Sequence, residues 1–384
     1  MAQDGKIKVL QFPIANSKGG ITQYILQNWK FIDKSRFQFD FATMSKKLDF
    51  EKELKLDNCN IFYISCYAEE NKEQFKIEFR EILQKGKYDV VHLHTKQWKS
   101  TLVEEIAKEV GVKRVIVHAH STGIDTLDLR KREMEIQLHQ DVLERLEDSI
   151  ATDFWTCSKL AADFLFGNKI ASENIVYMPN AIDLEKFAYN KNLRNKYRKE
   201  LHIKDNEIVI GNIGRMVYQK NQLFLLKVFK KICDKSDDFR LLLVGTGELE
   251  NELRDYVKVH HLESKVDFLG FRKDVYGLLQ AFDIFCLPSR FEGFPISVVE
   301  AHASGLRCIV SDAVTEEIEM SKLVSRIPMN EMLWVKDICN YQKDDRAIYA
   351  RITRDLGYEI KEQILYVQKG YECNTCQKGN NCYT

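Results

Sequence analysis

The chain has 384 residues, which is too many for one ordinary hydrophobic core and suits two domains of about 150–200 residues each. Lys+Arg and Asp+Glu number 57 each, and this balance argues against a broad basic surface for nucleic acid. The N-terminus has no apolar stretch of signal-peptide length, and no run of about 18 apolar residues occurs, so we expect a cytoplasmic protein without a membrane span.

In the first half of the chain, short apolar runs alternate with longer helical patterns. The predicted strands are Lys8–Phe12, Asn60–Ser65, Val90–His94 and Arg114–His118, and the predicted helices are Ile21–Trp29, Val103–Val110 and Arg130–Leu146. This alternation is typical of a parallel sheet covered by helices.

The same alternation restarts in the second half. Its predicted strands are Glu207–Ile213, Arg240–Val244, Lys265–Leu269, Ile284–Leu287 and Leu306–Val310, with helices at Leu223–Cys233 and Leu249–Val259. We therefore predict an α/β protein with two Rossmann-like, doubly wound domains, joined by the turn 179–183 and the charged segment 184–204. The predicted domains are residues 1–185 and 186–365, with room for the C-terminal helix to pack back on the first, and a tail at 366–384.

The densest functional signal is the segment Ser289–Glu300, which follows a predicted strand. Pro295 suits the first turn of a helix, whose free N–H groups at Phe294–Ser297 would bind a diphosphate without a metal. Glu292 before this helix and Glu300 inside it can accept hydrogen bonds from hydroxyls at opposite ends of one ligand, such as its sugar and its ribose. Two glutamates alone more often have no such role, so this signal needs a second one.

A second signal lies in the strand and glycine turn Ile208–Gly214, which is followed by Arg215 and then Lys220. Glycine lets a backbone approach a ligand closely, and the two cations on one loop can hold a diphosphate from its outer side. A pair of surface cations is usually only solvated. This pair, however, follows a strand end, where ligands of open α/β sheets bind.

Three further loops carry weaker signals, because glycine after a strand is common in structural turns. Gly245 and Gly247 follow one strand, and the neighbouring segment Phe268–Arg272 is placed to meet a nucleobase through main-chain groups. Gly19 and Gly20 precede a predicted helix and form a phosphate-approach loop that matches neither GxGxxG nor a P-loop.

Two histidines end the predicted strand Arg114–His118 and its extension to Ser121. We expect His118 and His120, two positions apart, to point to opposite faces, so that only one of them faces the site. A buried, hydrogen-bonded core histidine is an equally weighted interpretation of either.

Taken together, these residues resemble the retaining glycosyltransferases of family 4, which have the GT-B architecture of two Rossmann-like domains facing a central cleft. The most specific element is the E-x7-E motif formed by Glu292 and Glu300. Supporting elements are Gly19-Gly20, His120, Pro179-Asn180-Ala181-Ile182-Asp183 and Gly214-Arg215-x4-Lys220-Asn221. Ala181 stands where the family usually has glycine. The segments 151–159 and 165–167 resemble the capsular and exopolysaccharide branch.

The resemblance implies a set of site residues. The implied catalytic residues are Glu292, His120, Arg215 and Lys220, and the implied donor-binding residues are Gly19, Gly20, Gly214, Arg215, Lys220, Phe271, Arg272, Glu292, Gly293, Phe294, Pro295, Ile296, Ser297 and Glu300. Arg215 and Lys220 would bind the donor diphosphate and stabilise the leaving group. Gly20 would approach the phosphates from the facing domain.

The sugar and the ribose have their own implied partners. Glu300 would hold the ribose, Glu292 with the backbone of residues 293–295 would hold the transferred sugar, and His120 would contact that sugar near the reacting carbon. The implied reaction moves a hexosyl or N-acetylhexosaminyl group with retention, from a UDP-sugar by preference. No Asp-x-Asp occurs in the sequence, which favours a metal-independent reaction with no cofactor.

The acceptor is expected to be a glycan, by preference on a lipid-linked polysaccharide precursor. The basic segment Asp128–Arg132 would meet a lipid-linked diphosphate or the inner membrane surface, although a solvated helix start is the favoured interpretation. The oligomeric state stays open.

Three other functions are consistent with the same domains. A nicotinamide oxidoreductase would need the dinucleotide fingerprint, which is missing. A sugar-nucleotide epimerase of the same fold would consume donor without an acceptor. A non-catalytic nucleotide-sugar-binding subunit is disfavoured by the full set of charged site residues.

The ten cysteines are mostly scattered through apolar segments, and we expect them to be reduced. The tail differs, because Cys373, Cys376 and Cys382 include a C-x2-C spacing. A structural zinc site needs four ligands and no fourth is obvious, so a frayed terminus is the favoured interpretation.

Overall fold

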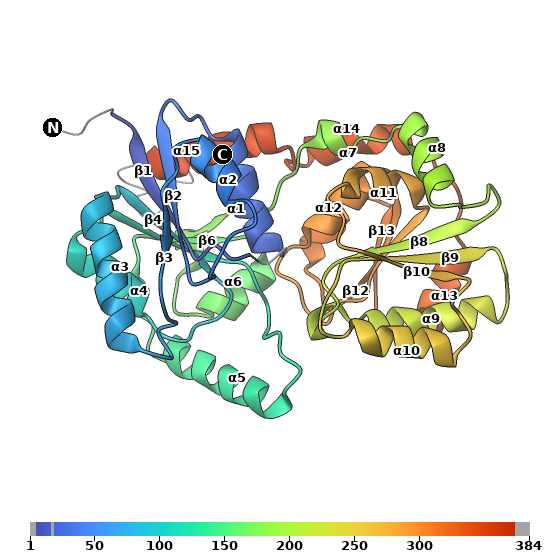
Figure 1. The fold of residues 1–384 in the computed structure, drawn as a ribbon, viewed down its shortest axis with the longest axis horizontal. Helices are drawn as coiled ribbons and strands as arrows, with labels where there is room; N and C mark the ends of the chain where they lie inside the picture. Colours follow the sequence, from blue (N-terminus) through green and yellow to red (C-terminus); the bar gives the residue numbers. More distant parts are fainter. Residues whose placement is uncertain (1–4, 17–18, 373–384) are drawn as a thin grey trace. The chain divides into compact units, whose positions relative to one another are not determined.

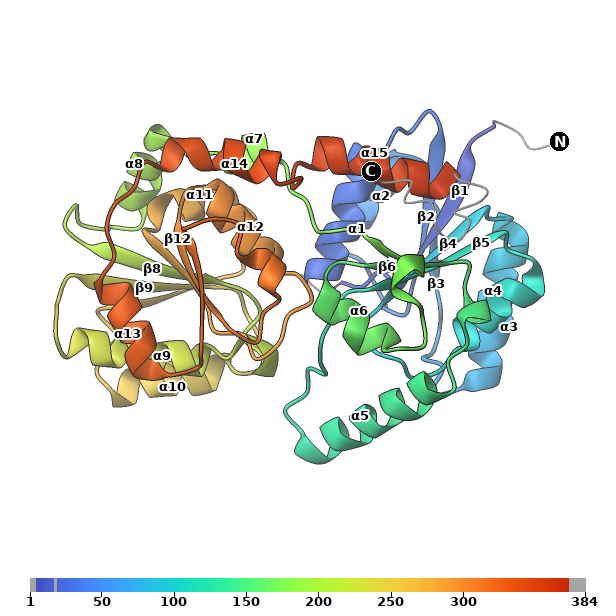
Figure 2. The ribbon, with the colours of Figure 1, turned by 180° about the vertical axis from the view of Figure 1, so that it is seen from behind.

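The computed structural model describes residues 5–16 and 19–372. The chain divides into two units (Figures 1 and 2). The first unit comprises Met1–Ile124, Arg130–Pro179 and Lys361–Thr384, and the second comprises Asp125–Leu129 and Asn180–Ile360. The sequence placed the boundary at 185/186, whereas the structure divides the chain after Pro179 and returns to the first unit at Lys361.

The first unit is built on a seven-stranded parallel sheet in the order β3-β2-β1-β4-β5-β6-β7. Its strands are β1 Ile7–Phe12, β2 Phe37–Thr43, β3 Ile61–Tyr63, β4 Val90–Thr95, β5 Arg114–Ala119, β6 Asp153–Thr156 and β7 Ile175–Tyr177. Its helices are α1 Gly20–Phe31, α2 Glu51–Leu56, α3 Lys72–Gly86, α4 Leu102–Val110, α5 Leu129–Glu144, α6 Lys159–Phe166 and α15 Ile360–Glu372.

Both faces of this sheet are covered by helices (Figure 1). Helices α1, α2 and α15 share one core with the strands, to which α15 contributes Ile364, Val367 and Tyr371. On the opposite face, the ring of Phe12 packs on Phe79 of α3 with centroids 5.0 Å apart. The last helix of the chain is therefore part of the first unit.

The second unit is built on a six-stranded parallel sheet in the order β10-β9-β8-β11-β12-β13. Its strands are β8 Ile208–Ile213, β9 Phe239–Val244, β10 Val266–Gly270, β11 Ile284–Leu287, β12 Arg307–Ser311 and β13 Val324–Ile327. Its helices are α7 Leu184–Phe187, α8 Lys191–Glu200, α9 Gln222–Cys233, α10 Glu250–Val259, α11 Val275–Ala281, α12 Ile296–Ala303, α13 Glu331–Cys339 and α14 Tyr349–Asp355.

The central strands of this sheet are buried on both faces. In β9 the run Leu241–Val244 is at most 3% exposed, as expected for a parallel strand between two layers of helices. Helices α9, α10 and α13 pack on one face, and α11 and α12 lie on the other (Figure 2). The two predicted parallel sheets are confirmed.

A buried ion cluster holds α8 against this sheet. The Asp283 carboxylate, 4% exposed, accepts hydrogen bonds from Arg194 Nη2 at 2.7 Å, from Arg198 Nη1 at 3.2 Å and from the Val209 backbone N–H at 2.9 Å. Both guanidinium groups also donate to backbone carbonyls, and Asp283 is the counter-ion that they share.

Both sheets reverse their strand order beside their first strand. In the first unit the reversal lies between β1 and β4, and in the second between β8 and β11. Ligands of open α/β sheets bind outside the carboxyl ends of the strands at such a point. The loops that follow these four strands are therefore where a ligand is expected to bind.

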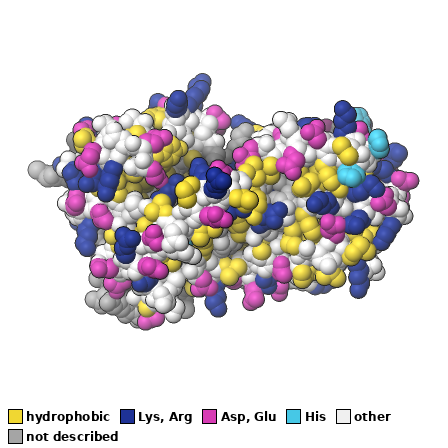
Figure 3. All heavy atoms as spheres, turned by 90° about the horizontal axis from the view of Figure 1, so that it is seen from below, with side chains coloured by type: hydrophobic (Ala, Val, Ile, Leu, Met, Phe, Trp, Pro, Cys, Tyr) yellow, Lys and Arg dark blue, Asp and Glu magenta, His cyan; other side chains and the backbone are white. Residues whose placement is uncertain are grey.

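The surface carries charges of both signs, as the equal numbers of basic and acidic residues predict. On the face drawn in Figure 3, Lys and Arg side chains are interspersed with Asp and Glu. None of the described helices is long and apolar enough to cross a membrane.

Candidate functional site

In the second unit, two loops meet at the carboxyl ends of β8 and β11. The loop after β8 contains Gln219 and Lys220, and the loop after β11 contains Glu292. Lys220 Nζ donates to Glu292 Oε1 at 2.6 Å, and Gln219 Nε2 donates to Glu292 Oε2 at 3.2 Å. The two predicted signals are thus joined by an ion pair at the reversal of strand order.

The Glu292 carboxylate is buried and well supplied with donors. The residue is 6% exposed, and Ser289 Oγ donates to the same Oε1 at 2.6 Å. The Lys220 side chain is 15% exposed, and its aliphatic stem lies 3.3 Å from where a Cβ would stand on Gly214. A Cβ at Gly214 would therefore require this stem to shift by a few tenths of an ångström.

Arg215 and the Gln219 backbone converge on a single carboxylate. Arg215 Nη2 donates to Asp125 Oδ2 at 3.0 Å, and the Gln219 N–H donates to Asp125 Oδ1 at 3.1 Å. A guanidinium beside a backbone N–H is the donor set that proteins use for phosphate oxygens. The loop after β8 therefore has anion-binding geometry.

The glycines after β9 serve the packing of two loops. A Cβ on Gly245, whose φ is +132°, would stand 2.0 Å from the Gly214 carbonyl oxygen, and one on Gly247 would stand 2.2 Å from that of Met216. Because these contacts are with backbone atoms, the loops cannot yield by moving a side chain. The turn at 245–247 thus supports the Arg215 loop from behind.

Helix α12 begins at Ile296 with Pro295 as its N-cap, one residue later than the sequence indicated. No side chain caps its first turn. The preceding loop is anchored, since Asn180 Nδ2 donates to the Phe294 carbonyl at 2.7 Å and the Phe294 ring stacks on Tyr358 with centroids 5.4 Å apart. The segment Gly293–Ser297, which leads from Glu292 into α12, is thereby fixed in place.

Glu300 lies in the middle of α12. Burial of its carboxyl group raises the pKa of Glu300 to about 8, although the positive charge of Lys186 acts to lower it. A carboxyl group with this pKa changes charge close to physiological pH.

Phe271 and Arg272 follow β10. Phe271 is 40% exposed. Arg272 Nε and Nη2 donate to the two carboxylate oxygens of Asp274 at 2.7 and 2.6 Å, and Nη2 also donates to Glu200 at 3.3 Å, which raises the pKa of Arg272. The Arg272 guanidinium is therefore bound by two carboxylates. The groups of this turn that could bind a ligand are those of its main chain.

In the first unit, Gly19 and Gly20 stand at the start of α1. Gly19 is the N-cap, and a Cβ on Gly20 would meet no atom of residues 5–16 and 19–372 within 4 Å. Packing does not require glycine there. The open space fits the close approach of a ligand to the helix N-terminus.

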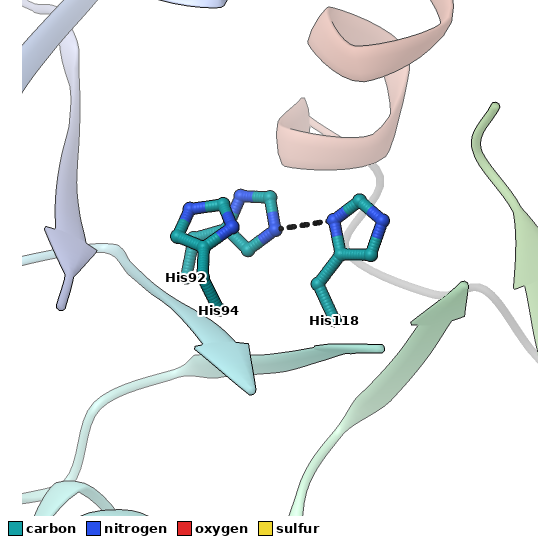
Figure 4. A group of neighbouring side chains, drawn as sticks. All are labelled: His92, His94 and His118. Carbon is teal, nitrogen blue, oxygen red and sulfur yellow. Dashed lines mark hydrogen bonds between the residues drawn. The ribbon is translucent and has the colours of Figure 1, made fainter. Parts of the chain in front are cut away.

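The prediction that His118 and His120 point to opposite faces is wrong. Their ring centroids are 4.0 Å apart, because alternate residues of a strand share a face. His92 and His94 of β4 lie beside them, with His94 opposite His118 in the parallel register. Four histidines thus gather at the ends of β4 and β5, and Figure 4 shows three of them.

These histidines belong to one hydrogen-bonded network that includes Gln11 of β1 and Tyr371 of α15. His120 Nε2 meets His94 Nδ1 at 2.9 Å, and His94 Nε2 meets Gln11 Oε1 at 2.7 Å. Burial lowers the pKa of all four histidines, that of His120 to about 3. All four rings are therefore neutral near pH 7.

Glycosyltransferases are among the known proteins that this chain matches. The family model described as glycosyl transferases group 1 matches residues 194–321. The putative glycosyltransferase EpsF of Bacillus subtilis is 29% identical over 97% of this chain and 98% of its own. The UDP-Gal:alpha-D-GlcNAc-diphosphoundecaprenol alpha-1,3-galactosyltransferase of Escherichia coli is 27% identical over 80% of each chain.

The solved structure of Anabaena Alr3699/HepE, in complex with UDP-glucose, has a TM-score of 0.73 at 16% identity, over 95% of this chain and 100% of that one. The fold is GT-B. Together, the comparisons support a group 1 glycosyltransferase.

The sequence missed several residues that lie in the charged loops of the second unit or in the histidine network of the first. Gln219, in the loop after β8, contacts Glu292, and Asp125 accepts a hydrogen bond from the backbone of the same loop. Gln11, His94 and Tyr371 complete the histidine network. One signal was available, because His92 and His94 repeat the spacing of His118 and His120 on the next strand. The contacts of Asp125 and Tyr371 depend on chain segments far apart in sequence.

Among residues 5–16 and 19–372, only His92, His94 and His118 form a group of three or more potential ligands whose atoms lie within 4.8 Å of one another. The cysteines Cys373, Cys376 and Cys382 lie outside the described residues. A surface depression at the amino ends of β12 and β13 contains Arg307 and Lys322. Both cations are already paired with aspartates at 2.8 Å, so this depression offers no charge to a ligand.

Proposed function

We propose that the chain is a retaining, metal-independent glycosyltransferase of family 4. It moves a hexosyl or N-acetylhexosaminyl group from a UDP-sugar to a glycan acceptor. The observation that carries this proposal is the meeting of Arg215, Lys220 and Glu292 at the carboxyl ends of β8 and β11. Two cations and one buried carboxylate suit a ligand that joins a diphosphate to a sugar.

The diphosphate binds to Arg215, Lys220 and the first N–H groups of α12. Arg215 and the Gln219 N–H already hold one anion, the Asp125 carboxylate, which a phosphate group would replace. The positive end of α12 adds to this field. Glu300, a little more than one turn into the helix, accepts hydrogen bonds from the ribose hydroxyls.

The same cations promote the reaction. The bond between the anomeric carbon and the diphosphate oxygen breaks, and the acceptor oxygen forms the new bond on the same face. The acceptor proton passes to the departing diphosphate. Negative charge grows on that group, where Arg215 and Lys220 are fixed in advance, so they stabilise the transition state more than the ground state. Glu292 holds a sugar hydroxyl.

Two relatives support the choice of substrates. The Escherichia coli relative is named as a galactosyltransferase that uses UDP-Gal and GlcNAc-diphosphoundecaprenol, and the Anabaena structure is a complex with UDP-glucose. We therefore favour uracil as the base and a lipid-linked glycan as the acceptor. Such an acceptor lies at a membrane, where the basic start of α5, with Arg130 and Lys131, would meet it from the cytoplasmic side.

Ligand-induced thermal stabilisation tests the donor site. Purified protein is heated with UDP-, GDP- and ADP-sugars, with and without EDTA. We expect a chelator-insensitive rise in Tm for UDP-sugars that is lost in Arg215→Ala and kept in Lys231→Met, which removes an exposed lysine on α9. Absence of a shift with every nucleotide sugar would contradict the proposal.

The affinity for UDP is expected to depend on pH through Glu300. Its pKa of about 8 means that the carboxyl group is neutral at pH 7 and charged above pH 8. Hydroxyl donors bind the charged form more strongly, so affinity should rise between about pH 7 and about pH 9, by up to about tenfold. Titration calorimetry in Glu300→Gln should show this rise abolished. An identical pH profile in both proteins would exclude the assignment.

A further inference from the structure

The histidine network has a fixed direction, which begins at Gln11 in β1. Gln11 is 2% exposed, and its Oε1 lies 2.7 Å from His94 Nε2. An amide oxygen only accepts hydrogen bonds, so His94 Nε2 carries the proton. A neutral imidazole has one N–H, and therefore His94 Nδ1 carries a lone pair.

That lone pair faces the ring of His120. His94 Nδ1 and His120 Nε2 are 2.9 Å apart, so His120 Nε2 must be the donor and carry the proton. The second nitrogen of His120, Nδ1, is then left with a lone pair. Burial lowers the pKa of His120 to about 3, so this ring stays neutral at working pH and is too weak a base to remove a proton.

Tyr371 closes the network on its other side. Gln11 Nε2 donates to Tyr371 Oη at 3.2 Å. Tyr371 Oη lies 2.7 Å from His92 Nδ1, and His92 Nε2 lies 3.1 Å from His118 Nδ1. With the amide placed in this way, a set of protons in which Tyr371 donates to His92 and His92 donates to His118 satisfies every one of these contacts.

The geometry of His92 and His118 favours this shared proton over a metal ion. The two ring planes differ by 5°, and their centroids are 5.3 Å apart. With facing nitrogens 3.1 Å apart, such rings are nearly in line, as Figure 4 shows by the dashed bond. The lone pairs of metal ligands converge instead on a common third point, about 2.0–2.1 Å from each nitrogen.

We infer that Gln11 and His94 are positioning residues that fix His120 as the Nε2–H tautomer, so that its Nδ1 accepts a hydrogen bond from a hydroxyl of the bound sugar. The hydroxyl contact rests on the proposed function, whereas the tautomer does not. A His120 ring that rotated freely, or that occurred as both tautomers, would present an N–H donor to the same hydroxyl for part of the time. The network thus selects which sugar hydroxyls His120 can orient.

Nitrogen-15 NMR of histidine-labelled protein tests the tautomer without any substrate, because protonated and bare ring nitrogens differ widely in shift. In the wild-type protein His120 should carry its proton on Nε2. Gln11→Met, which removes the amide, should give His120 a mixture of tautomers. Gln11→Glu keeps an oxygen acceptor on His94 and should retain the Nε2–H form, as should the control Gln74→Met on α3.

Kinetics provides the second readout. Gln11→Met should lower kcat about tenfold, the effect of one misdirected hydrogen bond, with unchanged affinity for UDP, which lacks the transferred sugar. A merely structural role would alter Tm and UDP binding as well.

Three outcomes would overturn the inference: an Nδ1–H tautomer of His120 in the wild-type protein, an unchanged tautomer in Gln11→Met, or stoichiometric Zn²⁺ binding that His92→Ala abolishes. The first needs no variant, so it decides even if Gln11→Met does not fold. The predicted tautomer in a protein that transfers no sugar would support the network and contradict only the proposed function.

Discussion

Lys220→Met is expected to lower kcat by about 10²–10³-fold while the protein remains folded. Lys220 Nζ lies 2.6 Å from Glu292, the residue proposed to hold the transferred sugar. Methionine has a similar length and keeps the packing over Gly214, so the change removes mainly the charge. The leaving diphosphate then departs without one of its two fixed cations. Initial rates of UDP release at saturating donor measure the effect.

The control for this prediction separates charge from position. Lys220→Arg keeps the charge and should retain more activity than Lys220→Met, while Lys231→Met should behave as the wild type. A Lys220→Met enzyme with more than about a tenth of the wild-type kcat would show that leaving-group stabilisation lies elsewhere.

Asp283→Asn is expected to destabilise the second unit by about 3–5 kcal/mol, because it leaves Arg194 and Arg198 buried without their counter-ion. The Arg198 side chain is 9% exposed and that of Arg194 is 16% exposed, so water cannot replace the lost carboxylate. Asparagine still offers one acceptor, but no charge. The free energy of unfolding, obtained from urea titration, measures the loss.

Asp237→Asn is the matched control. Asp237 pairs with Lys265 at 3.0 Å, but its side chain is 96% exposed. We therefore expect Asp237→Asn to lower the free energy of unfolding by less than about 1 kcal/mol. If both variants lost the same free energy, burial would not be what makes the Asp283 cluster important.

The sequence predicted the strands with continuous apolar runs and missed several of the others. Central strands such as β9 and β11 were found, because their runs Leu241–Val244 and Ile284–Leu287 are apolar and buried throughout. Strand β2, Phe37–Thr43, carries Gln38 and Asp40, and β6, Asp153–Thr156, is short and contains an aspartate that pairs with Arg114 at 2.9 Å. Polar residues that are paired in the fold interrupt the apolar run of a strand, so the strand cannot be recognised from hydrophobicity alone.

The sequence also predicted which loops hold the charged residues, and the structure explains why. Arg215, Lys220 and Glu292 follow β8 and β11, and parallel strands bring their carboxyl ends to one edge. The order of those strands is not visible in the sequence, so the ion pair between Lys220 and Glu292 could not be derived from it. The roles of these residues in binding a donor remain predictions.

The histidines show the opposite case. A correct periodicity for a strand places His118 and His120 on one face, and the expectation of opposite faces came from a wrong alternation. The neighbours of these rings, His94 and Gln11, come from two other strands. Only the parallel register and the packing of α15 bring them together.

The measurement that tests the central claim most directly is product analysis by mass spectrometry. The protein is incubated in EDTA with UDP-galactose, UDP-glucose or UDP-N-acetylglucosamine and a polyprenyl-diphosphate-linked N-acetylglucosamine acceptor. The account predicts, for one of these donors, free UDP and an acceptor heavier by one sugar residue, both lost in Lys220→Met. A donor converted to an isomer of the same mass, with the acceptor unchanged, would instead indicate an epimerase and contradict the account.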